Sequence, residues 1–387
     1  MDVKAKTKVL FIVPVPPPYT GLEVMSSLFL DSRIKEEFNI LHICSNLNRL
    51  NCSRGTLRVY NLYRFFILCC KIFISEILLH PKTTYSILSE NFTGFMRVSF
   101  IVLIAKLFNN KVVMHLHGAN FRNYYINRGF FMQGYIRFVL KKIDCIAVLD
   151  ENLKQQFSGI YPPDKIEVVP NGIFPKEQDF SENRFNKNSS GNIDILFLGL
   201  LSQAKGFHEA LKAIPLVLER EKNVRFIFAG ERIKVERNIL FDYEGKRIKD
   251  ENIDGLILEL THKYSQQIIF SGVVEGKSKD ELFKKSDIFI LPSYSEGLPL
   301  SIIEAMSYGL PVITTAVGAL PDYLKDGENC FFIQPGDYQK LSEKLICLIR
   351  DPLLRREMGR NNYRDLKNKF DIKDSAKRLT EVLHKLE

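Results

Sequence analysis

The stretch "DIFILPSYSEGLPLSIIEAMSYGLPVITT", residues 287–315, decides the fold class. Its first part, "IFILPS", is apolar enough for a strand that is buried on both faces, as in a parallel sheet. Gly297 permits a sharp turn, and Pro299 suits the first turn of a helix, which then runs to a suitable C-cap at Gly309. The run "PVITT" (311–315) restarts the strand pattern. A strand, a helix and a strand in this order predict a βαβ unit.

The same alternation extends along the chain in both directions. Short β-rich runs separated by longer helical patterns occur at 8–13, 38–44, 84–89, 111–117, 145–150 and 166–170, and again at 193–199, 224–230 and 267–272. Residues 177–192 are polar, with almost no aliphatic side chains, which is typical of a linker. The sequence therefore predicts two Rossmann-like α/β domains with doubly wound parallel sheets, over residues 1–176 and 193–370.

The remaining parts of the chain are assigned by their patterning. Leu379, Val382, Leu383 and Leu386 follow helical spacing, so residues 371–387 are predicted as an amphipathic helix that packs back toward the N-terminal domain. Residues 231–262 are charged and poorly patterned, and we interpret them as an excursion beside the sheet. Ligands of doubly wound folds bind beyond the carboxyl ends of the strands, so we expect the site in a central cleft that both domains face.

Size and composition agree with two soluble domains. The chain has 387 residues, 45% hydrophobic and 26% charged, which is too long for one ordinary core. Its seven cysteines form no C-x-x-C pair, and their odd number favours a reducing compartment over a disulfide framework. The start of the chain lacks the pattern of a secretory signal. The apolar runs 65–79 and 98–108 are shorter than a spanning helix and contain charges, so we expect core helices.

Charge is divided unevenly between the two halves. Residues 1–142 hold 19 Lys and Arg against 7 Asp and Glu, whereas residues 143–387 hold 35 against 38. The first half therefore carries a net +12 and the second a net −3, which sum to the +9 of the chain. Anionic lipid headgroups and nucleic acid both attract such a surface. A merely solvated basic surface is the alternative.

Two carboxylates, Glu296 and Glu304, flank the predicted start of the helix in the decisive stretch. The N-terminus of a helix presents unpaired N–H groups and the positive end of its dipole, which suits a phosphate. Glu296 would repel phosphate but can accept hydrogen bonds from sugar hydroxyls, and Glu304 can hold a second polyol such as ribose. Alternatively, one glutamate is exposed and the other is structural.

The spacing of these glutamates resembles the E-x7-E element of retaining glycosyltransferases of the GT-B fold. The surrounding residues 287–322 are similar to glycosyltransferase family 4 over their whole length. Further matches occur in the family's order, and they cover most of residues 8–337: "PPPYTGLE" (16–23), "VVMHLHGANF" (112–121), "IEVVPNGI" (166–173), "ILFLGLLSQAKGFHEALKA" (195–213) and "IIFSGVVEG" (268–276).

This resemblance implies roles for particular residues. Glu296 and the backbone after it, at Gly297 and Leu298, would bind the donor sugar, while Glu304 would hold the ribose of the nucleotide. Lys205 would lie against the diphosphate, where positive charge favours the leaving group. The catalytic residues implied are His117, Lys205 and Glu296, and the donor-binding residues are Gly21, Lys205, Glu296, Gly297, Leu298 and Glu304.

The histidine pair leaves one choice open. His115 and His117 face the same side of a strand, and His117 lies at its carboxyl end, where the ligand is expected. The resemblance implies that His117 contacts the donor sugar near the reacting carbon, although a structural histidine remains the alternative. Asn171 is predicted in a tight turn of structural importance. The residues after the histidines, Arg122, Tyr124, Tyr125 and Arg128, are candidates for acceptor contacts by position alone.

The sequence departs from the family's pattern at two places. Leu200 stands where the family often has an arginine, so a second cation for the diphosphate is missing there. Ser202, Gln203 or an arginine of the first domain are candidates to compensate. Thr20 stands where a second glycine is common, which leaves Gly21 alone to let backbone approach the phosphate.

Motifs that the chain lacks also discriminate. No D-x-D occurs, so the ligands that hold a metal-bound diphosphate in the other large glycosyltransferase fold are missing, and we expect no metal. Neither G-x-G-x-x-G nor a P-loop occurs, so the motifs typical of dinucleotide-binding and nucleoside-triphosphate-binding proteins are missing. No cofactor is expected beyond the donor itself, a UDP-, GDP- or other nucleoside-diphosphate sugar.

The resemblance predicts a retaining hexosyltransferase that acts on a hydroxyl of a glycan or a lipid-linked oligosaccharide in surface polysaccharide biosynthesis. We expect it in the cytoplasm, peripheral on the inner face of the membrane through its basic domain, with no nucleic acid as partner. Closure of the domains would exclude water from the site. A nucleotide-sugar epimerase of the same fold and a non-catalytic nucleotide-sugar binding protein are the alternatives.

Overall fold

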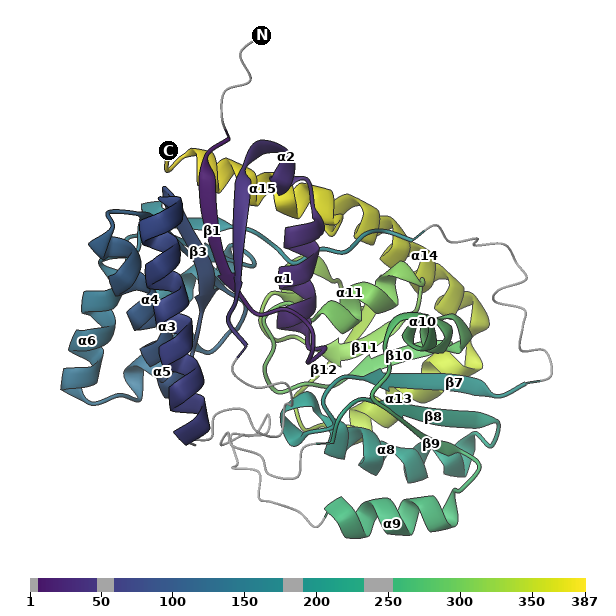
Figure 1. Cartoon of the computed structure of the whole chain (residues 1–387). Helices are drawn as coiled ribbons and strands as arrows, with labels where there is room; N and C mark the ends of the chain where they lie inside the picture. The colour runs from purple at the N-terminus through teal and green to yellow at the C-terminus, as the bar shows by residue number, and fades with distance from the viewer. Residues whose placement is uncertain (1–5, 47–58, 177–190, 233–252) are drawn as a thin grey trace. The chain divides into compact units, whose positions relative to one another are not determined.

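The structure, a computed structural model, describes residues 6–46, 59–176, 191–232 and 253–387 (Figure 1). It divides into two compact units, each with its own sheet. Unit 1 comprises Met1–Phe174 together with Phe370–Glu387, and unit 2 comprises Pro175–Lys369. Most of the predicted linker, 177–192, lies outside the described residues.

Unit 1 is built on six parallel strands in the order β2-β1-β3-β4-β5-β6. The strand order extends from β1 to β2 on one side and from β1 to β3 on the other, so the topology reverses between β1 and β3. The bounds are β1 Lys8–Val13, β2 Asn39–Cys44, β3 Thr83–Leu88, β4 Lys111–Leu116, β5 Cys145–Val148 and β6 Ile166–Val168.

Helices cover both faces of this sheet. Figure 1 shows α3, α4 and α6 side by side on one flank, while α1 and α2 pack with α15. The C-terminal helix α15 begins after Asp371, whose side chain caps it by accepting a hydrogen bond from the Lys373 N–H at 2.9 Å. The bounds are α1 Gly21–Asp31, α2 Ile34–Glu37, α3 Val59–Leu79, α4 Phe92–Leu107, α5 Phe121–Ile126, α6 Phe130–Leu140, η2 Asn152–Phe157, η3 Pro163–Lys165 and α15 Ile372–His384.

The prediction that residues 65–79 form a core helix is wrong for most of their side chains. In α3, Leu68 and Ile72 are buried, but Phe66, Ile74 and Leu78 are 66%, 53% and 69% exposed. Only one face of α3 packs on α4, and no described element covers the other. Within the described residues, no helix is both long enough and apolar enough to cross a bilayer.

Unit 2 repeats the plan with six parallel strands in the order β12-β11-β10-β7-β8-β9. Its topology reverses between β7 and β10, because β8 and β9 lie on one side of β7 and β10 lies on the other. The last strand, β12, had not been predicted. The bounds are β7 Ile193–Leu198, β8 Val224–Ala229, β9 Ile268–Gly272, β10 Ile288–Leu291, β11 Val312–Thr315 and β12 Cys330–Ile333.

The helices of unit 2 also lie on both faces of the sheet. Of the excursion predicted at 231–262, residues 253–262 are helical in α9 and residues 233–252 lie outside the described part. The bounds are η4 Gln203–Lys205, α8 Phe207–Arg220, α9 Ile253–Lys263, α10 Gly276–Lys285, α11 Leu300–Ser307, α12 Leu320–Tyr323, α13 Tyr338–Arg350 and α14 Pro352–Lys369.

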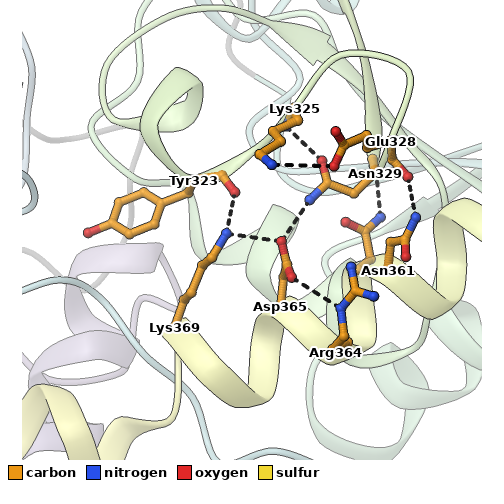
Figure 2. A network of polar contacts seen from close by, with 9 residues as sticks. Tyr323, Lys325, Glu328, Asn329, Asn361, Arg364, Asp365 and Lys369 are labelled. Atoms are coloured by element: carbon orange, nitrogen blue, oxygen red, sulfur yellow. Dashed lines mark hydrogen bonds and ion pairs between the residues drawn. The ribbon is translucent and has the colours of Figure 1, made fainter.

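A polar network fixes the end of α14, the point at which the chain leaves unit 2 (Figure 2). The ammonium of Lys369 donates to the Tyr323 carbonyl at 3.2 Å and to the Asp365 carboxylate at 3.0 Å. The Asn329 amide donates to the same carboxylate at 3.1 Å. These contacts hold α14 against the loop that precedes β12.

Candidate active site

A turn after β7 and the strand β10 meet at the point where the topology of unit 2 reverses. Gly206 has a φ of +74°, and a Cβ atom there would lie 2.1 Å from the Pro292 carbonyl oxygen, so only glycine fits. The Tyr294 N–H donates to the Ala204 carbonyl at 2.9 Å, which joins the two segments again. This close approach places Lys205, the last residue of η4, beside the loop after β10.

Lys205 and Glu296 form a bidentate ion pair. The ammonium lies 2.7 Å from each carboxylate oxygen of Glu296, and the Ser293 hydroxyl donates to one of them at 2.7 Å. Glu296 is 7% exposed, whereas the Lys205 side chain keeps 29% of its surface. An ammonium has three donors, and Glu296 takes two of them. The pair can therefore meet an anion through Lys205 while the carboxylate stays compensated.

The loop after β10 is held by β11 and by the turn that follows β11. The Thr315 hydroxyl donates to the Ser293 carbonyl at 2.5 Å, and the Ala319 N–H donates to the Gly297 carbonyl at 2.9 Å. Gly297 and Leu298, predicted to bind the donor sugar, are both buried here. Their position is thus fixed by β11 and the turn that follows it.

The helix α11 starts directly after this loop. Pro299 is the N-cap of α11, whereas the sequence had placed it inside the first helical turn. Its carbonyl accepts hydrogen bonds from the Ile302 and Ile303 N–H groups at 3.1 and 3.4 Å. The N–H groups of a helix's first turn lack partners inside the helix. The start of α11 therefore offers backbone donors and the positive end of its dipole.

Glu304 lies in α11 and forms a second ion pair, with Lys279 of α10. Lys279 Nζ lies 2.5 Å from Glu304 Oε1, and the side chains are 22% and 17% exposed. The sequence analysis missed Lys279, because nothing in the local pattern after β9 distinguishes it from the neighbouring lysines at 277, 284 and 285. Only its contact with Glu304, 25 residues further along the chain, singles it out.

The residues proposed to compensate for Leu200 are close to Lys205 in the chain and mostly buried. Ser202 is 7% and Gln203 5% exposed. The Gln203 amide nitrogen has no hydrogen-bond partner among the described residues. A buried amide without a partner is costly, which makes Gln203 the better of these two candidates for a ligand contact.

In unit 1, the two histidines at the end of β4 have different surroundings. His115 is fully buried: Nε2 lies 3.0 Å from the Val169 carbonyl oxygen, and Nδ1 lies 2.8 Å from the Tyr85 hydroxyl. Burial holds the pKa of His115 well below its ordinary value, with the neighbouring imidazole of His117 adding to the effect. Both ring nitrogens are therefore engaged within the unit, and His115 is structural.

His117 keeps part of its surface. Its Nδ1 lies 3.0 Å from Asn171 Oδ1, so with Nδ1 as donor the Nε2 atom carries a lone pair. Burial lowers the pKa of His117 to about 4, although the bond to Asn171 acts in the opposite direction. A neutral imidazole at the carboxyl end of β4 can accept a hydrogen bond from a ligand hydroxyl at pH 7.

Glu90 is a further polar group beside this loop, and the sequence analysis missed it. Its carboxylate accepts a hydrogen bond from the Asn120 N–H at 2.8 Å. A Cβ atom at Gly118 would lie 2.1 Å from Glu90 Oε1, so glycine is needed for this approach. Burial raises the pKa of Glu90, and the Asn120 hydrogen bond offsets only part of that effect.

The other sequence candidates of unit 1 have different placements. Gly21 is the first residue of α1, and nothing lies within 4 Å of the Cβ position there, so its surroundings are open. Thr20 donates its hydroxyl to the Glu23 carboxylate. Tyr124 and Tyr125, suggested as acceptor contacts, are only 6% and 5% exposed because α5 packs into the core. They are poor candidates for binding an acceptor.

Arg122 and Arg128, named with them, make contacts inside unit 1. Arg122 donates to the Ser158 carbonyl at 2.8 Å, and the Arg128 guanidinium lies 4.8 Å from the centre of the Tyr124 ring. No three His, Cys, Asp or Glu side chains lie together as a metal site would need within the described ranges.

Comparison with solved structures identifies the fold. The chain superimposes on the HepE protein of Anabaena, solved with UDP-glucose, with a TM-score of 0.71 at 16% identity, over 98% of this chain and 99% of that one. Two six-stranded parallel sheets, one in each unit, and the similarity to these structures show the GT-B fold that the sequence predicted.

Comparison of sequences shows what the C-terminal part of the chain is similar to. Residues 179–365 match the family model "Glycosyl transferases group 1". An uncharacterised glycosyltransferase of Methanocaldococcus jannaschii is 27% identical over 61% of this chain and 59% of its own length. CapM of Staphylococcus aureus, a capsular polysaccharide biosynthesis glycosyltransferase, is 26% identical over 62% of this chain and 63% of its own length. The chain thus spans about three fifths of these relatives' length.

Proposed function

We propose that this protein is a retaining glycosyltransferase that moves a sugar from a nucleoside-diphosphate sugar to a hydroxyl. The observation that carries the proposal is the Lys205–Glu296–Ser293 cluster, which lies at the topological reversal of unit 2. It also lies within the part of the chain that matches the glycosyltransferase family model. HepE, with a similar fold, was solved with UDP-glucose, which supports a donor of this class.

The chemical roles follow from the contacts of each side chain. Lys205 keeps one ammonium donor for an oxygen of the diphosphate, and the N–H groups at the start of α11 offer more. Charge stabilisation of the leaving diphosphate would then come from Lys205 and backbone dipoles, so the proposal needs no metal. Gln203 would supply the contact that Leu200 cannot make.

Retention of configuration requires either a carboxylate nucleophile or attack from the face that the diphosphate leaves. Glu296 is a poor nucleophile, because its carboxylate accepts two hydrogen bonds from Lys205 and one from Ser293. We therefore propose same-face attack, in which an oxygen of the departing diphosphate takes the proton of the acceptor hydroxyl. Glu296 then serves as a hydrogen-bond acceptor for the donor sugar.

The remaining polar groups complete the donor contacts. Glu304, fixed by Lys279, would accept hydrogen bonds from the ribose hydroxyls. His117 would meet the sugar near the reacting carbon through Nε2, since Asn171 occupies Nδ1. With a pKa of about 4, His117 stays neutral at working pH and can accept a hydrogen bond there.

We propose the class of acceptor from the role of a relative and from the charge of the chain. CapM acts in capsular polysaccharide biosynthesis, and surface polysaccharides suit a glycan or lipid-linked acceptor at the inner face of a membrane. The basic first half of the chain, net +12, favours such a place.

One assay tests the function. The full-length protein is incubated with UDP-, GDP- and ADP-sugars, with and without lipid-linked glycan acceptors, while free nucleotide and sugar identity are followed. We expect nucleoside diphosphate to be released only with acceptor, and the product to keep the anomeric configuration of the donor. An altered free sugar would indicate an epimerase, and binding without turnover a non-catalytic protein.

A further inference from the structure

Exposed apolar side chains concentrate in one part of unit 1. Fourteen of the twenty-one large apolar residues that are exposed in the described part of the chain lie between residues 62 and 138. Phe130 and Phe131, at the start of α6, are 84% and 91% exposed. Isolated exposed apolar residues are ordinary, but a concentration of aromatic side chains on neighbouring helices marks an interaction site.

These side chains lie on the outer faces of helices whose inner faces are packed. In α3, Phe66, Phe73 and Ile77 recur at helical spacing and are 66%, 41% and 45% exposed. The opposite side of α3 meets α4, where the rings of Phe65 and Phe100 lie 5.3 Å apart. We call the outward faces of α3, α4 and α6 the α3–α6 surface. Because the inner faces of these helices are packed, the α3–α6 surface belongs to the folded part of unit 1.

The charge of the same region has one sign. Residues 59–142 contain eleven Lys and Arg but only two Asp and Glu. One of the two acids, Glu76, is 1% exposed, and the other, Glu90, is partly buried. Lys71 and Lys141, by contrast, are exposed among the apolar side chains. The α3–α6 surface therefore presents aromatic rings and cations without an exposed carboxylate of its own.

Topology gives this surface a direction. Each of α3, α4 and α6 ends shortly before the amino end of the next parallel strand, β3, β4 and β5 respectively, so the three helices begin toward the carboxyl ends of the strands (Figure 1). Tyr63, Phe92 and Phe130 lie at those starts and are 61%, 48% and 84% exposed. His117 follows β4 at this same end. Aromatic groups and the candidate ligand-binding histidine thus lie at one end of unit 1.

We propose that the α3–α6 surface docks on the interface of an anionic lipid bilayer. Its aromatic side chains would enter the headgroup region, and its lysines and arginines would contact the lipid phosphates, as in interfacial amphipathic helices. A second copy of the chain fits less well, because two surfaces of net +9 over residues 59–142 would repel each other. The proposal rests on the proposed function only in that the bilayer would supply a lipid-linked acceptor near His117.

The test is co-sedimentation of the full-length protein with phosphatidylcholine vesicles, with and without 30% phosphatidylglycerol. We expect binding to the anionic vesicles alone, weakened by salt. The double substitution Phe130→Asp and Phe131→Asp should reduce the partition coefficient about tenfold or more, because it removes two apolar groups and adds repulsion. Leu353→Asp, at a 74% exposed residue of α14, is the matched control and should bind like the wild type.

A second variant separates lipid docking from local misfolding. Lys141→Glu leaves the aromatic residues in place, and it should weaken binding to anionic vesicles about threefold or more while keeping the unfolding temperature. Donor binding by isothermal titration is measured on the same samples and should not change in any variant, so failure of the proposed function would be seen separately. No binding to anionic vesicles, or equal loss with Leu353→Asp, would overturn the proposal. A dimer in light scattering that both charge variants dissociate would assign the surface to a second copy instead.

Discussion

Two sets of buried ionisable side chains, one in each unit, have opposite surroundings. In unit 2, the mostly buried carboxylates of Glu296 and Glu304 each pair with a lysine, at 2.7 and 2.5 Å. In unit 1, the Glu76 carboxylate is 1% exposed, and its partners among the described residues are neutral: the Asn110 amide at 2.6 Å and the Thr84 hydroxyl at 3.3 Å. Burial raises the pKa of Glu76 to about 7 despite these hydrogen bonds.

The histidines extend the contrast. Burial lowers the pKa values of both His115 and His117, so both are neutral at pH 7. The described interior of unit 1 thus favours neutral forms of these groups, whereas the candidate site of unit 2 keeps charges in compensated pairs. A diphosphate needs compensated charge, and a sugar or acceptor hydroxyl needs neutral hydrogen-bonding groups. We therefore propose that the charged pairs of unit 2 serve the diphosphate and that the neutral groups of unit 1 serve the hydroxyls.

The largest effect should come from removing the charge nearest the proposed diphosphate. Lys205→Met is expected to lower kcat about 10²- to 10³-fold, the usual cost of losing one group that stabilises developing charge. The measurement is steady-state transfer with the donor found in the assay above. Lys285→Met, at a 69% exposed lysine, is the control. Equal activity of the two variants would contradict the role of Lys205.

The buried acid of unit 1 should respond with a gain in stability. The folded-state pKa of Glu76, about 7, lies above the ordinary 4.5, so its contribution is present below pH 4.5 and is lost as pH rises through 7. Glu76→Gln removes that loss and should raise the free energy of unfolding by about 2 kcal/mol at pH 8, with little change at pH 4.5. Urea unfolding followed by circular dichroism measures it.

A matched variant checks this effect. Glu36→Gln, at a side chain that is 69% exposed, should change stability little at either pH. If Glu76→Gln instead destabilised the protein at pH 8, the carboxylate would be ionised and compensated, and the contrast between the units would fail.

The second ion pair of unit 2 can be dissected by a double-mutant cycle. Glu304→Gln should weaken donor binding about tenfold, since a charged hydrogen bond to the ribose is lost. Lys279→Gln should weaken it less, because Lys279 acts by fixing Glu304. The double variant should bind about as well as Glu304→Gln alone. Strictly additive losses in isothermal titration would mean that Lys279 contacts the donor independently.

The smallest predicted effect is on the pH dependence of stability, and it concerns His117. Its pKa of about 4 lies below the ordinary 6.5, so the unfolded chain binds more protons between these values. Stability from the neutral form is therefore full above pH 6.5 and declines as pH falls toward 4. His117→Gln should make the free energy of unfolding less steep in that range, by up to about one proton. An unchanged slope would place the charged form of His117 in the folded protein.

Much of the fold was predictable from local patterns. The strands of both sheets follow apolar runs bounded by turn residues, and eleven of the twelve strands in the described residues were located from them. The short strand Cys330–Ile333 was missed, although its four apolar residues lie between the turn residues of "DGEN" and "QPGD". The exposure of α3 was also unpredictable, since helical apolar spacing does not reveal whether a partner covers the second face.

The candidate site was partly predictable. Resemblance to the family's motifs selected Lys205 and Glu296, and the structure brings the two into contact. Lys279 and Glu90 were not found, because the partner that each one contacts lies about 25 to 30 positions away in the chain. Such partners depend on how helices pack and strands align. A single sequence carries no signal for them.

The account depends most on the claim that unit 2 binds a nucleotide through its diphosphate at Lys205. The direct test is isothermal titration of the wild type and of Lys205→Met with UDP, GDP and ADP and with the matching nucleosides. We predict that at least one diphosphate binds about 100-fold or more tightly than its nucleoside, and that Lys205→Met loses about tenfold of this preference while nucleoside binding is unchanged. A nucleoside that binds as tightly as its diphosphate, or a preference that Lys205→Met leaves intact, would contradict the claim.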